Sequence, residues 1–312
     1  MTSREFSLVA LMTMAGLASH PQSAQAQAAP PLFQSGVDVV RVSTTVRDRK
    51  GRFVVDLSPT DFEILDDGQP RPVSDLRREL AGVSIAILFD VSGSMAGELA
   101  HAREAAMHLL SWLEPADEVA IYTFDTRLAE VTPFTTGLRT LPPSMSAAVP
   151  FGATSLHDAI ARTARRIGIR DGRRPAIVVL TDGNDNASQL TAPEVSGVAS
   201  AIDVPVYIFG VVLSIDNPLT EFSTVGDRSA LAGPLSDLAS WTGGRVFLAS
   251  TPAARSQAAQ QIVDELRHQY VIAFESTGKP GWHPIVVRAR GKDLVVRARS
   301  GYFAGQSRPN SE

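Results

Sequence analysis

The central part of the chain, residues 83–249, alternates apolar runs with stretches of helical periodicity, and this alternation restricts the fold more than any other feature. Most of the runs are continuously apolar, which is typical of strands covered on both faces of a parallel sheet. The six runs read VSIAILFDV, EVAIYTFD, RLAEVTPF, PAIVVLTD, PVYIFGVV and RVFLA.

The stretches between the runs favour amphipathic helices. Pro115 ends the first of them, and a second begins near Leu156. Each places its apolar residues on one helical face: Leu99, Ala102, Ala106, Leu110 and Leu113 in the first, and Leu156, Ile160, Ala164 and Ile167 in the second. We therefore expect a domain over residues 83–250 with the α/β fold, in which a doubly wound, mostly parallel six-stranded sheet is covered on both faces.

The segments on either side of this domain have a different pattern. Residues 37–80 and 268–304 contain short strand-like runs separated by charged or Gly/Pro-containing turns. Neither segment has enough apolar surface for a core of its own. We therefore predict that both chain ends fold together as one smaller β module.

A near-repeat of VVRAR in the last segment predicts a tight hairpin through a two-residue Gly291-Lys292 turn. This register gives the two strands one apolar face and one basic face. The apolar face contains Ile285, Val287, Ala289, Leu294, Val296 and Ala298, and the basic face contains Arg288, Arg290, Arg297 and Arg299. A solvated basic face is the commoner outcome, and a docking surface is the alternative.

The N-terminal segment has the pattern of a secretory signal peptide over residues 1–26. Arg4 precedes an apolar stretch at residues 6–17, and AQA follows at residues 24–26. Glu5 weakens the positive region, so an uncleaved N-terminal anchor is the alternative. No later segment reaches the length of a transmembrane helix. We expect a secreted or periplasmic protein without a transmembrane segment after signal removal.

Composition excludes several classes of site. The 312 residues are 44% hydrophobic and carry a net charge of only -4, which favours a globular protein and gives no sign of nucleic-acid binding. The chain has no cysteine, so disulfides, thiolate metal sites and a cysteine nucleophile are excluded.

The first apolar run ends in FDVSGSM, which places Asp90, Ser92 and Ser94 at alternate positions. Two later segments have similar chemistry: Thr154 precedes a predicted helix, and Asp182 follows a predicted strand. Ligands of open α/β sheets bind outside the carboxyl ends of the strands. Two carboxylates and three hydroxyls are hard oxygen donors, which suit Mg²⁺ or Mn²⁺.

Together, DVSGSM, GATSLHDAI and LTDGND resemble the metal-ion-dependent adhesion site of von Willebrand factor type A domains, and the flanking β segments are similar to bacterial secreted proteins with such domains. The resemblance implies direct coordination of Mg²⁺ by Ser92 and Ser94. It implies that Thr154 binds the metal directly or through water, and that Asp90 and Asp182 act mainly through bound waters. It also implies a protein partner whose Asp or Glu carboxylate completes the metal shell.

Structural and enzymatic readings compete with this interpretation. Asp90 and Asp182 could be turn residues, and Thr154 or Ser155 could be a helix N-cap. A structural envelope protein with a merely stabilising metal and a metal-dependent hydrolase are the other function classes. The hydrolase interpretation is the less favoured one, because SGSMAG does not have the spacing of a nucleophile elbow and no phosphate-binding lysine motif occurs. We therefore predict a non-enzymatic interaction protein with no catalytic residues. We expect Asp185 to be solvated or to lie behind the metal ligands, and His157 to be a surface or structural residue.

Overall fold

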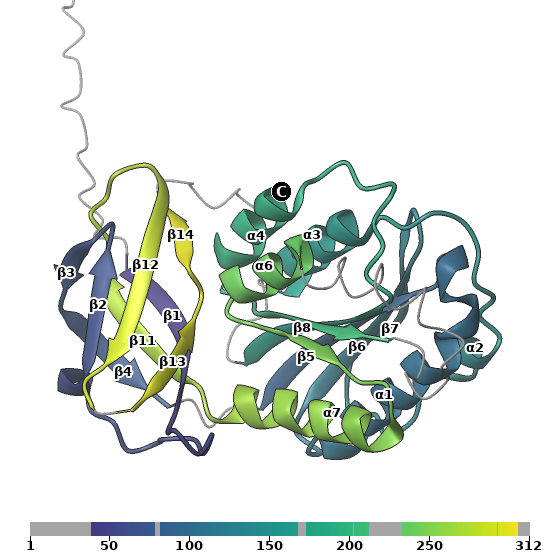
Figure 1. Ribbon diagram of the computed structural model, residues 1–312, viewed down its shortest axis with the longest axis horizontal. Helices are drawn as coiled ribbons and strands as arrows, with labels where there is room; N and C mark the ends of the chain where they lie inside the picture. Colours follow the sequence, from purple (N-terminus) through teal and green to yellow (C-terminus); the bar gives the residue numbers. More distant parts are fainter. Residues whose placement is uncertain are drawn as a thin grey trace, which may run out of the picture. The chain divides into compact units, whose positions relative to one another are not determined.

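The computed structural model describes residues 39–78, 82–167, 173–201, 203–211, 233–291 and 293–304. The predicted signal peptide at residues 1–26 lies outside these residues. The described chain forms one six-stranded sheet with helices on both faces and two four-stranded sheets (Figure 1).

The six-stranded sheet confirms the fold expected from the apolar runs. Its strand order is β10-β9-β8-β5-β6-β7, and every neighbouring pair is parallel except β6 and β7. The strands are β5 (Val83–Asp90), β6 (Glu118–Phe124), β7 (Leu128–Thr136), β8 (Arg174–Thr181), β9 (Val206–Gly210) and β10 (Val246–Leu248).

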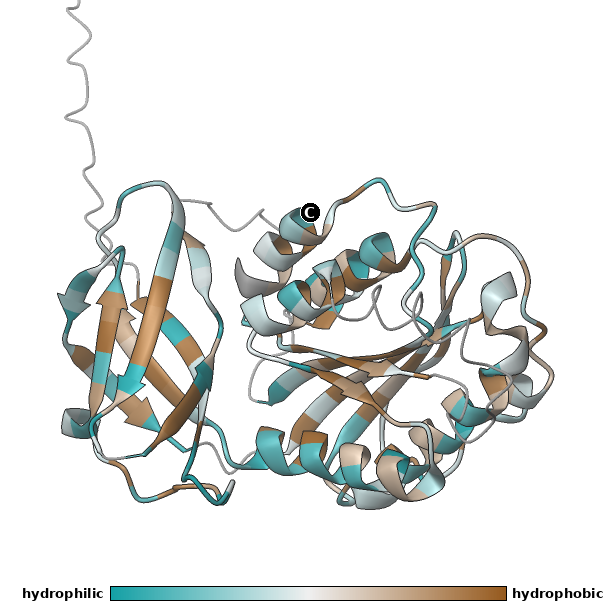
Figure 2. Cartoon of the chain, viewed as in Figure 1, coloured by the Kyte–Doolittle hydropathy of each residue, from teal (hydrophilic) through white to brown (hydrophobic). Residues whose placement is uncertain are grey.

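Helices cover both faces of this sheet because its strands are apolar on both sides. All eight residues of β5 are buried. Ile85 and Ile87 belong to the core on the side of α1 (Leu99–Trp112) and α7 (Pro252–Arg267). Ala86 and Leu88 belong to the core on the opposite side, which is covered by α3 (Leu156–Ile167), α4 (Ala192–Ala201) and α6 (Pro234–Trp241). Figure 2 shows the largely hydrophobic strands between helices of mixed polarity.

The remaining described helices are short. A 3₁₀ helix, η1 (Pro59–Asp61), precedes β2, and a second, η2 (Gly93–Gly97), is separated from the end of β5 by two residues. The helix α2 (Pro143–Ser146) lies between β7 and α3 in the chain.

Strands from both chain ends pair with one another, as predicted for the smaller β module. One sheet has the order β13-β1-β11-β4, and the other has the order β14-β12-β2-β3. The strands are β1 (Val39–Arg47), β2 (Phe62–Asp66), β3 (Gln69–Arg71), β4 (Val73–Arg77), β11 (Tyr270–Glu275), β12 (Gly281–Ala289), β13 (Val295–Ala298) and β14 (Gly301–Ala304). Their apolar residues form a third core, separate from the two of the large sheet.

The tight hairpin predicted for the two VVRAR stretches is wrong. The first stretch lies in β12, which pairs with β2 and β14, whereas the second lies in β13, which pairs with β1. The connecting residue Lys292 lies outside the described residues. Both predicted apolar sets contribute to the core, but they do so from two different sheets that share it.

The common arginine face of residues 285–299 is therefore wrong as well. Arg288 lies 3.7 Å from Glu63, and Arg297 binds the buried Glu265. Arg299 is 5% exposed, donates a hydrogen bond to the carbonyl of Arg41 and pairs with Asp203. These three side chains have different roles and do not form one basic surface.

Candidate metal centre

Asp90 is the last residue of β5, and it is completely buried. One of its carboxylate oxygens accepts a hydrogen bond from the backbone amide of Ser92 at 2.9 Å, and the other accepts one from the Thr181 hydroxyl at 2.7 Å. Because Thr181 ends the neighbouring strand β8, these bonds fix the carboxylate between two strand ends.

Burial makes the charged form of Asp90 unfavourable. Desolvation raises its pKa from 3.8 to about 6, the hydrogen bonds from Ser92 and Thr181 oppose this rise, and the negative charge of Asp182 adds to it. A cation beside both carboxylates would offset the desolvation and the repulsion and would favour their ionised forms. The electrostatics of the strand end therefore fit a bound cation.

Ser92 and Ser94 place their hydroxyl oxygens 3.1 Å apart. Ligands at adjacent octahedral positions of Mg²⁺ lie about 2.9 Å apart when each bond is about 2.0–2.1 Å long. Ser92 is 1% exposed, whereas Ser94 lies in η2 with its side chain on the surface. The pair has the spacing of two ligands of one ion, with its outer member toward solvent.

Thr154 is buried and stands two residues before the start of α3. Its backbone amide donates to the side-chain oxygen of Asn186 at 2.9 Å. Its carbonyl accepts hydrogen bonds from the amides of Asn186 and Ala187 at 3.1 and 2.9 Å. These bonds all use the backbone of Thr154, and they attach it to the loop that follows β8.

Asp182 is the first residue after β8 and is 8% exposed. Its carboxylate accepts a hydrogen bond from the amide of Asn184 at 3.1 Å, so the loop turns around it. Its charge acts on Asp90, as described above. Asp182 therefore brings the second carboxylate to the same edge of the sheet.

Further bonds join the first loop to the second. The amide of Phe151 donates to the carbonyl of Val91 at 2.9 Å, and the amide of Gly93 donates to the carbonyl of Gly152 at 2.9 Å. Gly152 has a φ of 84°, which is readily adopted only by glycine. All three loops are thus connected pairwise, and the structure brings the five predicted ligands, Asp90, Ser92, Ser94, Thr154 and Asp182, to one edge of the sheet.

Sequence reasoning missed two residues that position this site. Thr181 holds the Asp90 carboxylate, and Asn186 holds the Thr154 backbone. Thr181 stands directly beside a predicted ligand, and that adjacency was the only signal for it in the sequence. Asn186 had no comparable signal, because its contact is with a residue 32 positions away.

Asp185 and His157 form a pair at the start of α3. The Asp185 carboxylate accepts a hydrogen bond from the backbone amide of His157 at 2.9 Å and lies 2.9 Å from its ring Nδ1. Burial by itself would raise the pKa of Asp185, but the hydrogen bonds from His157 and Ser188 outweigh it and lower this pKa to about 2. Asp185 thus remains ionised and stabilises the loop.

The donor set suits a hard cation such as Mg²⁺ or Mn²⁺ rather than a metal that prefers imidazole or thiolate ligands. Within the residues that the structure describes, no group of three or more His, Cys, Asp and Glu side chains is arranged to hold a metal. The candidate centre instead combines two carboxylates with three hydroxyls, which is an all-oxygen set of the kind that Mg²⁺ and Mn²⁺ accept.

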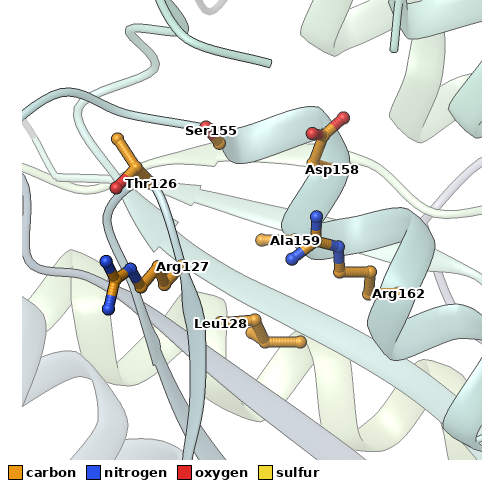
Figure 3. Close-up of a pocket in the computed structure, with 7 residues that line it drawn as sticks. All are labelled: Thr126, Arg127, Leu128, Ser155, Asp158, Ala159 and Arg162. Atoms are coloured by element: carbon orange, nitrogen blue, oxygen red, sulfur yellow. The ribbon is translucent and has the colours of Figure 1, made fainter. Parts of the chain in front are cut away.

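A shallow depression lies beside Ser155, at the start of α3 (Figure 3). Arg127, which follows β6, and Arg162 of α3 line it from two elements. Asp158 also lines it, and its carboxylate accepts hydrogen bonds from the amides of Gln189 and Leu190. The depression thus lies next to the Thr154 loop, but none of the five candidate ligands lines it.

Residues 85–184 match the family model described as von Willebrand factor type A domain. The matched range contains all five predicted ligands, Asp90, Ser92, Ser94, Thr154 and Asp182. These residues lie at one edge of the six-stranded sheet described above. This part of the chain is a von Willebrand factor type A domain. The expected family resemblance is therefore confirmed, and domains of this family are generally protein-interaction modules.

Several solved structures are similar to this chain at low sequence identity. An aerotolerance-related membrane protein from Bacteroides fragilis is 21% identical, with a TM-score of 0.45, and the match covers 59% of this chain and all of that one. A von Willebrand factor type A protein from Catenulispora acidiphila is 14% identical, with a TM-score of 0.44 and coverage of 88% and 76%. The ArnB paralog VWA2 from Sulfolobus acidocaldarius is 14% identical, with a TM-score of 0.44 and coverage of 86% and 76%.

A search of curated proteins gave no significant match. Across the described ranges, none of the helices combines the length and the apolar character that crossing a bilayer requires.

Proposed function

We propose that this chain is an exported protein that binds a protein partner through a divalent cation held by its von Willebrand factor type A domain. The observation that carries the proposal is the hydrogen-bonded set of three loops, in which Ser92 and Ser94 have the spacing of two ligands of one ion. Mg²⁺ or Mn²⁺ is the cofactor that this donor set fits.

The charge balance of the donor set supports binding of an acidic partner. Asp90 and Asp182 neutralise a divalent ion only formally, and hydroxyl oxygens are weak donors. The bound ion would therefore still accept a carboxylate from outside the chain. Ser94 lies at the surface, so the solvent-facing side of the site is open to an Asp or Glu of the partner.

The surroundings of the two serines support binding rather than catalysis. A hydrolase would need a general base within hydrogen-bonding reach of a nucleophile. The histidine in the adjoining helix, His157, places its Nδ1 against Asp185. The hydroxyls of Ser92 and Ser94 face each other. Assays with generic ester and phosphate substrates should therefore give no turnover that depends on Ser92 or Asp182.

Calorimetric titration of the full chain with MgCl₂ and MnCl₂ tests the metal site. We expect one ion to bind per chain, and we expect Asp182→Ala and the double variant Ser92→Ala, Ser94→Ala to lose that binding. Asp75→Ala is the control, because Asp75 is an exposed carboxylate of β4 that pairs with Arg77. Unchanged affinity in both site variants would refute the assignment.

Export is the second part of the proposal. It rests on the signal-like pattern of residues 1–26, with an uncleaved anchor as the competing outcome. N-terminal sequencing of the protein recovered from the periplasm or the medium of expressing bacteria tests it. A chain that begins after Ala26 supports cleavage and export, whereas full-length protein recovered with the membrane supports the anchor.

A further inference from the structure

The loop before Thr154 presents two large apolar side chains to solvent. Val149 is 80% exposed and Phe151 is 79% exposed. Of the large hydrophobic residues in the described part of the chain, these two are the most exposed. Single exposed apolar residues are common on protein surfaces, so exposure alone does not indicate a site. Here, two such residues stand two positions apart on one loop beside the candidate metal centre.

The backbone of this loop is fixed at both ends. Arg103 of α1 donates hydrogen bonds to the carbonyls of Met145, Ser146 and Ala148 at 2.8, 3.4 and 3.2 Å. At the other end, the amide of Phe151 donates to the carbonyl of Val91. The two apolar side chains are thus displayed from an anchored backbone.

The anchor of Phe151 uses only its backbone and lies beside the candidate metal centre. Its hydrogen-bond partner Val91 stands between Asp90 and Ser92 in the chain, and the next residue, Gly152, binds the amide of Gly93. Phe151 therefore emerges beside the loop that carries three of the five proposed ligands. A partner residue next to a coordinated carboxylate would lie within reach of the Phe151 ring.

The physical chemistry of this arrangement specifies the partner. An exposed phenyl ring and an exposed isopropyl group gain free energy only by contact with apolar surface. The metal would require an acidic residue in the same partner segment. Cationic or purely polar segments would leave Val149 and Phe151 in water.

We infer that Val149 and Phe151 form an apolar contact surface that selects a partner segment in which an Asp or Glu is flanked by an apolar side chain. This inference rests on the proposed metal-dependent function and adds the chemistry of the partner to it. Partial burial of each side chain predicts about a tenfold contribution to affinity for each of them.

A peptide-display selection tests the inference on the full chain. The library carries one fixed Asp or Glu between randomised positions, and it is selected in MgCl₂ and, in parallel, in EDTA. We expect peptides that are retained only in MgCl₂ and that carry aliphatic or aromatic residues next to the acidic position. The double variant Val149→Ser, Phe151→Ser should bind these peptides about 100-fold more weakly and should keep its affinity for Mg²⁺. Val295→Ser, an exposed apolar residue of β13, is the matched control.

The outcomes separate this inference from the proposed function. Peptides that depend on Mg²⁺ but show no apolar preference, or that bind the double variant as tightly as the wild type, would overturn the inference and leave the metal-dependent function intact. Selection without any Mg²⁺-dependent peptide would overturn both. A second copy of the chain is the competing occupant: self-association of the wild type that the double variant abolishes would overturn the inference in favour of an oligomer contact.

Discussion

At the scale of single residues, the candidate centre consists of ligands and of the side chains that hold them. Asp90 and Ser92 could be predicted from the sequence, because alternate polar positions at the end of an apolar strand are a local pattern. Thr181 and Asn186 could not be predicted, because their contacts with Asp90 and Thr154 cross from one loop to another. Such cross-loop contacts arise only when the fold brings distant segments together.

The role of Asn186 leads to a residue-scale prediction. Its side-chain oxygen fixes the amide of Thr154, so Asn186→Ala should let Thr154 leave the position in which it can reach the metal. We expect Mg²⁺ affinity to fall about tenfold, which is the lower end of the effect seen when groups behind metal ligands are removed. Calorimetry on Asn186→Ala measures this.

Asn184→Ala provides the matched control for that measurement. Both asparagines are exposed and lie in the same loop, but the hydrogen bond of Asn184 to Asp182 uses its backbone amide. The control should bind Mg²⁺ like the wild type. Equal affinities of the two variants would show that Asn186 does not position Thr154.

At the scale of secondary-structure elements, the start of α3 depends on an ionised carboxylate from another loop. Hydrogen bonds from His157 and Ser188 keep the pKa of Asp185 at about 2, against an ordinary value of 3.8. A lowered pKa stabilises the folded chain at every pH above the unfolded value, and this stabilisation is lost as the pH falls from about 4 toward 2. The negative charge also lies at a helix N-terminus, where it is favourable.

Asp185→Asn should therefore be less stable than the wild type at pH 7 by about 1 kcal/mol, because it removes the charge and one of the two oxygens that accept hydrogen bonds from the amides of His157 and Ser188. The difference should shrink between pH 4 and pH 3. Urea unfolding at pH 7, 4 and 3 measures it, with Asp75→Asn on the exposed surface of β4 as the control. A difference that stays constant with pH would contradict an electrostatic origin.

The strands show how far element-scale prediction reaches from sequence. Continuous apolar runs such as the one in β5 predicted the central sheet, because a strand that is covered on both faces needs apolar side chains at nearly every position. The alternation in β12 and β13 correctly predicted which side chains face the core, and it failed to predict the hydrogen-bond partners. An alternation with a period of two shows which face of a strand each side chain lies on. It does not show that β12 pairs with β2 and β14, because this pairing also depends on segments outside β12.

At the scale of the whole molecule, one buried carboxylate joins the von Willebrand factor type A domain to the β module. Glu265 lies near the end of α7 and is completely buried. It receives hydrogen bonds from Arg47 of β1 at 3.1 Å, from Arg245 at 3.2 Å, and from Arg297 of β13 at 3.0 and 3.1 Å. Burial and the charge of Glu265 also raise the pKa of Tyr207 in β9 well above its ordinary value.

This junction predicts that Glu265→Gln weakens the β module more than the large sheet. The substitution keeps the volume of the side chain, but it leaves three guanidinium groups without their shared negative charge, and removing one partner of a buried ionic group typically costs about 3–5 kcal/mol. The arginines are partly exposed, with side-chain exposures of 23, 36 and 34%. Water therefore offsets part of the loss, and we expect a decrease of about 2 kcal/mol in the free energy of unfolding.

Hydrogen exchange followed by mass spectrometry locates the effect of that substitution. Amides of β1 and β13 should exchange faster in Glu265→Gln, because Arg47 and Arg297 lie in these strands, while the amides of β5 should keep their protection. Glu104→Gln is the matched control: its partner Arg255 joins α1 to α7, so any effect should stay within the von Willebrand factor type A domain. Uniform loss of protection in β5 and β1 would show that Glu265 supports the whole fold instead. If Glu265 acts only at the junction between the two parts, its loss should loosen β1 and β13 without opening the core around β5.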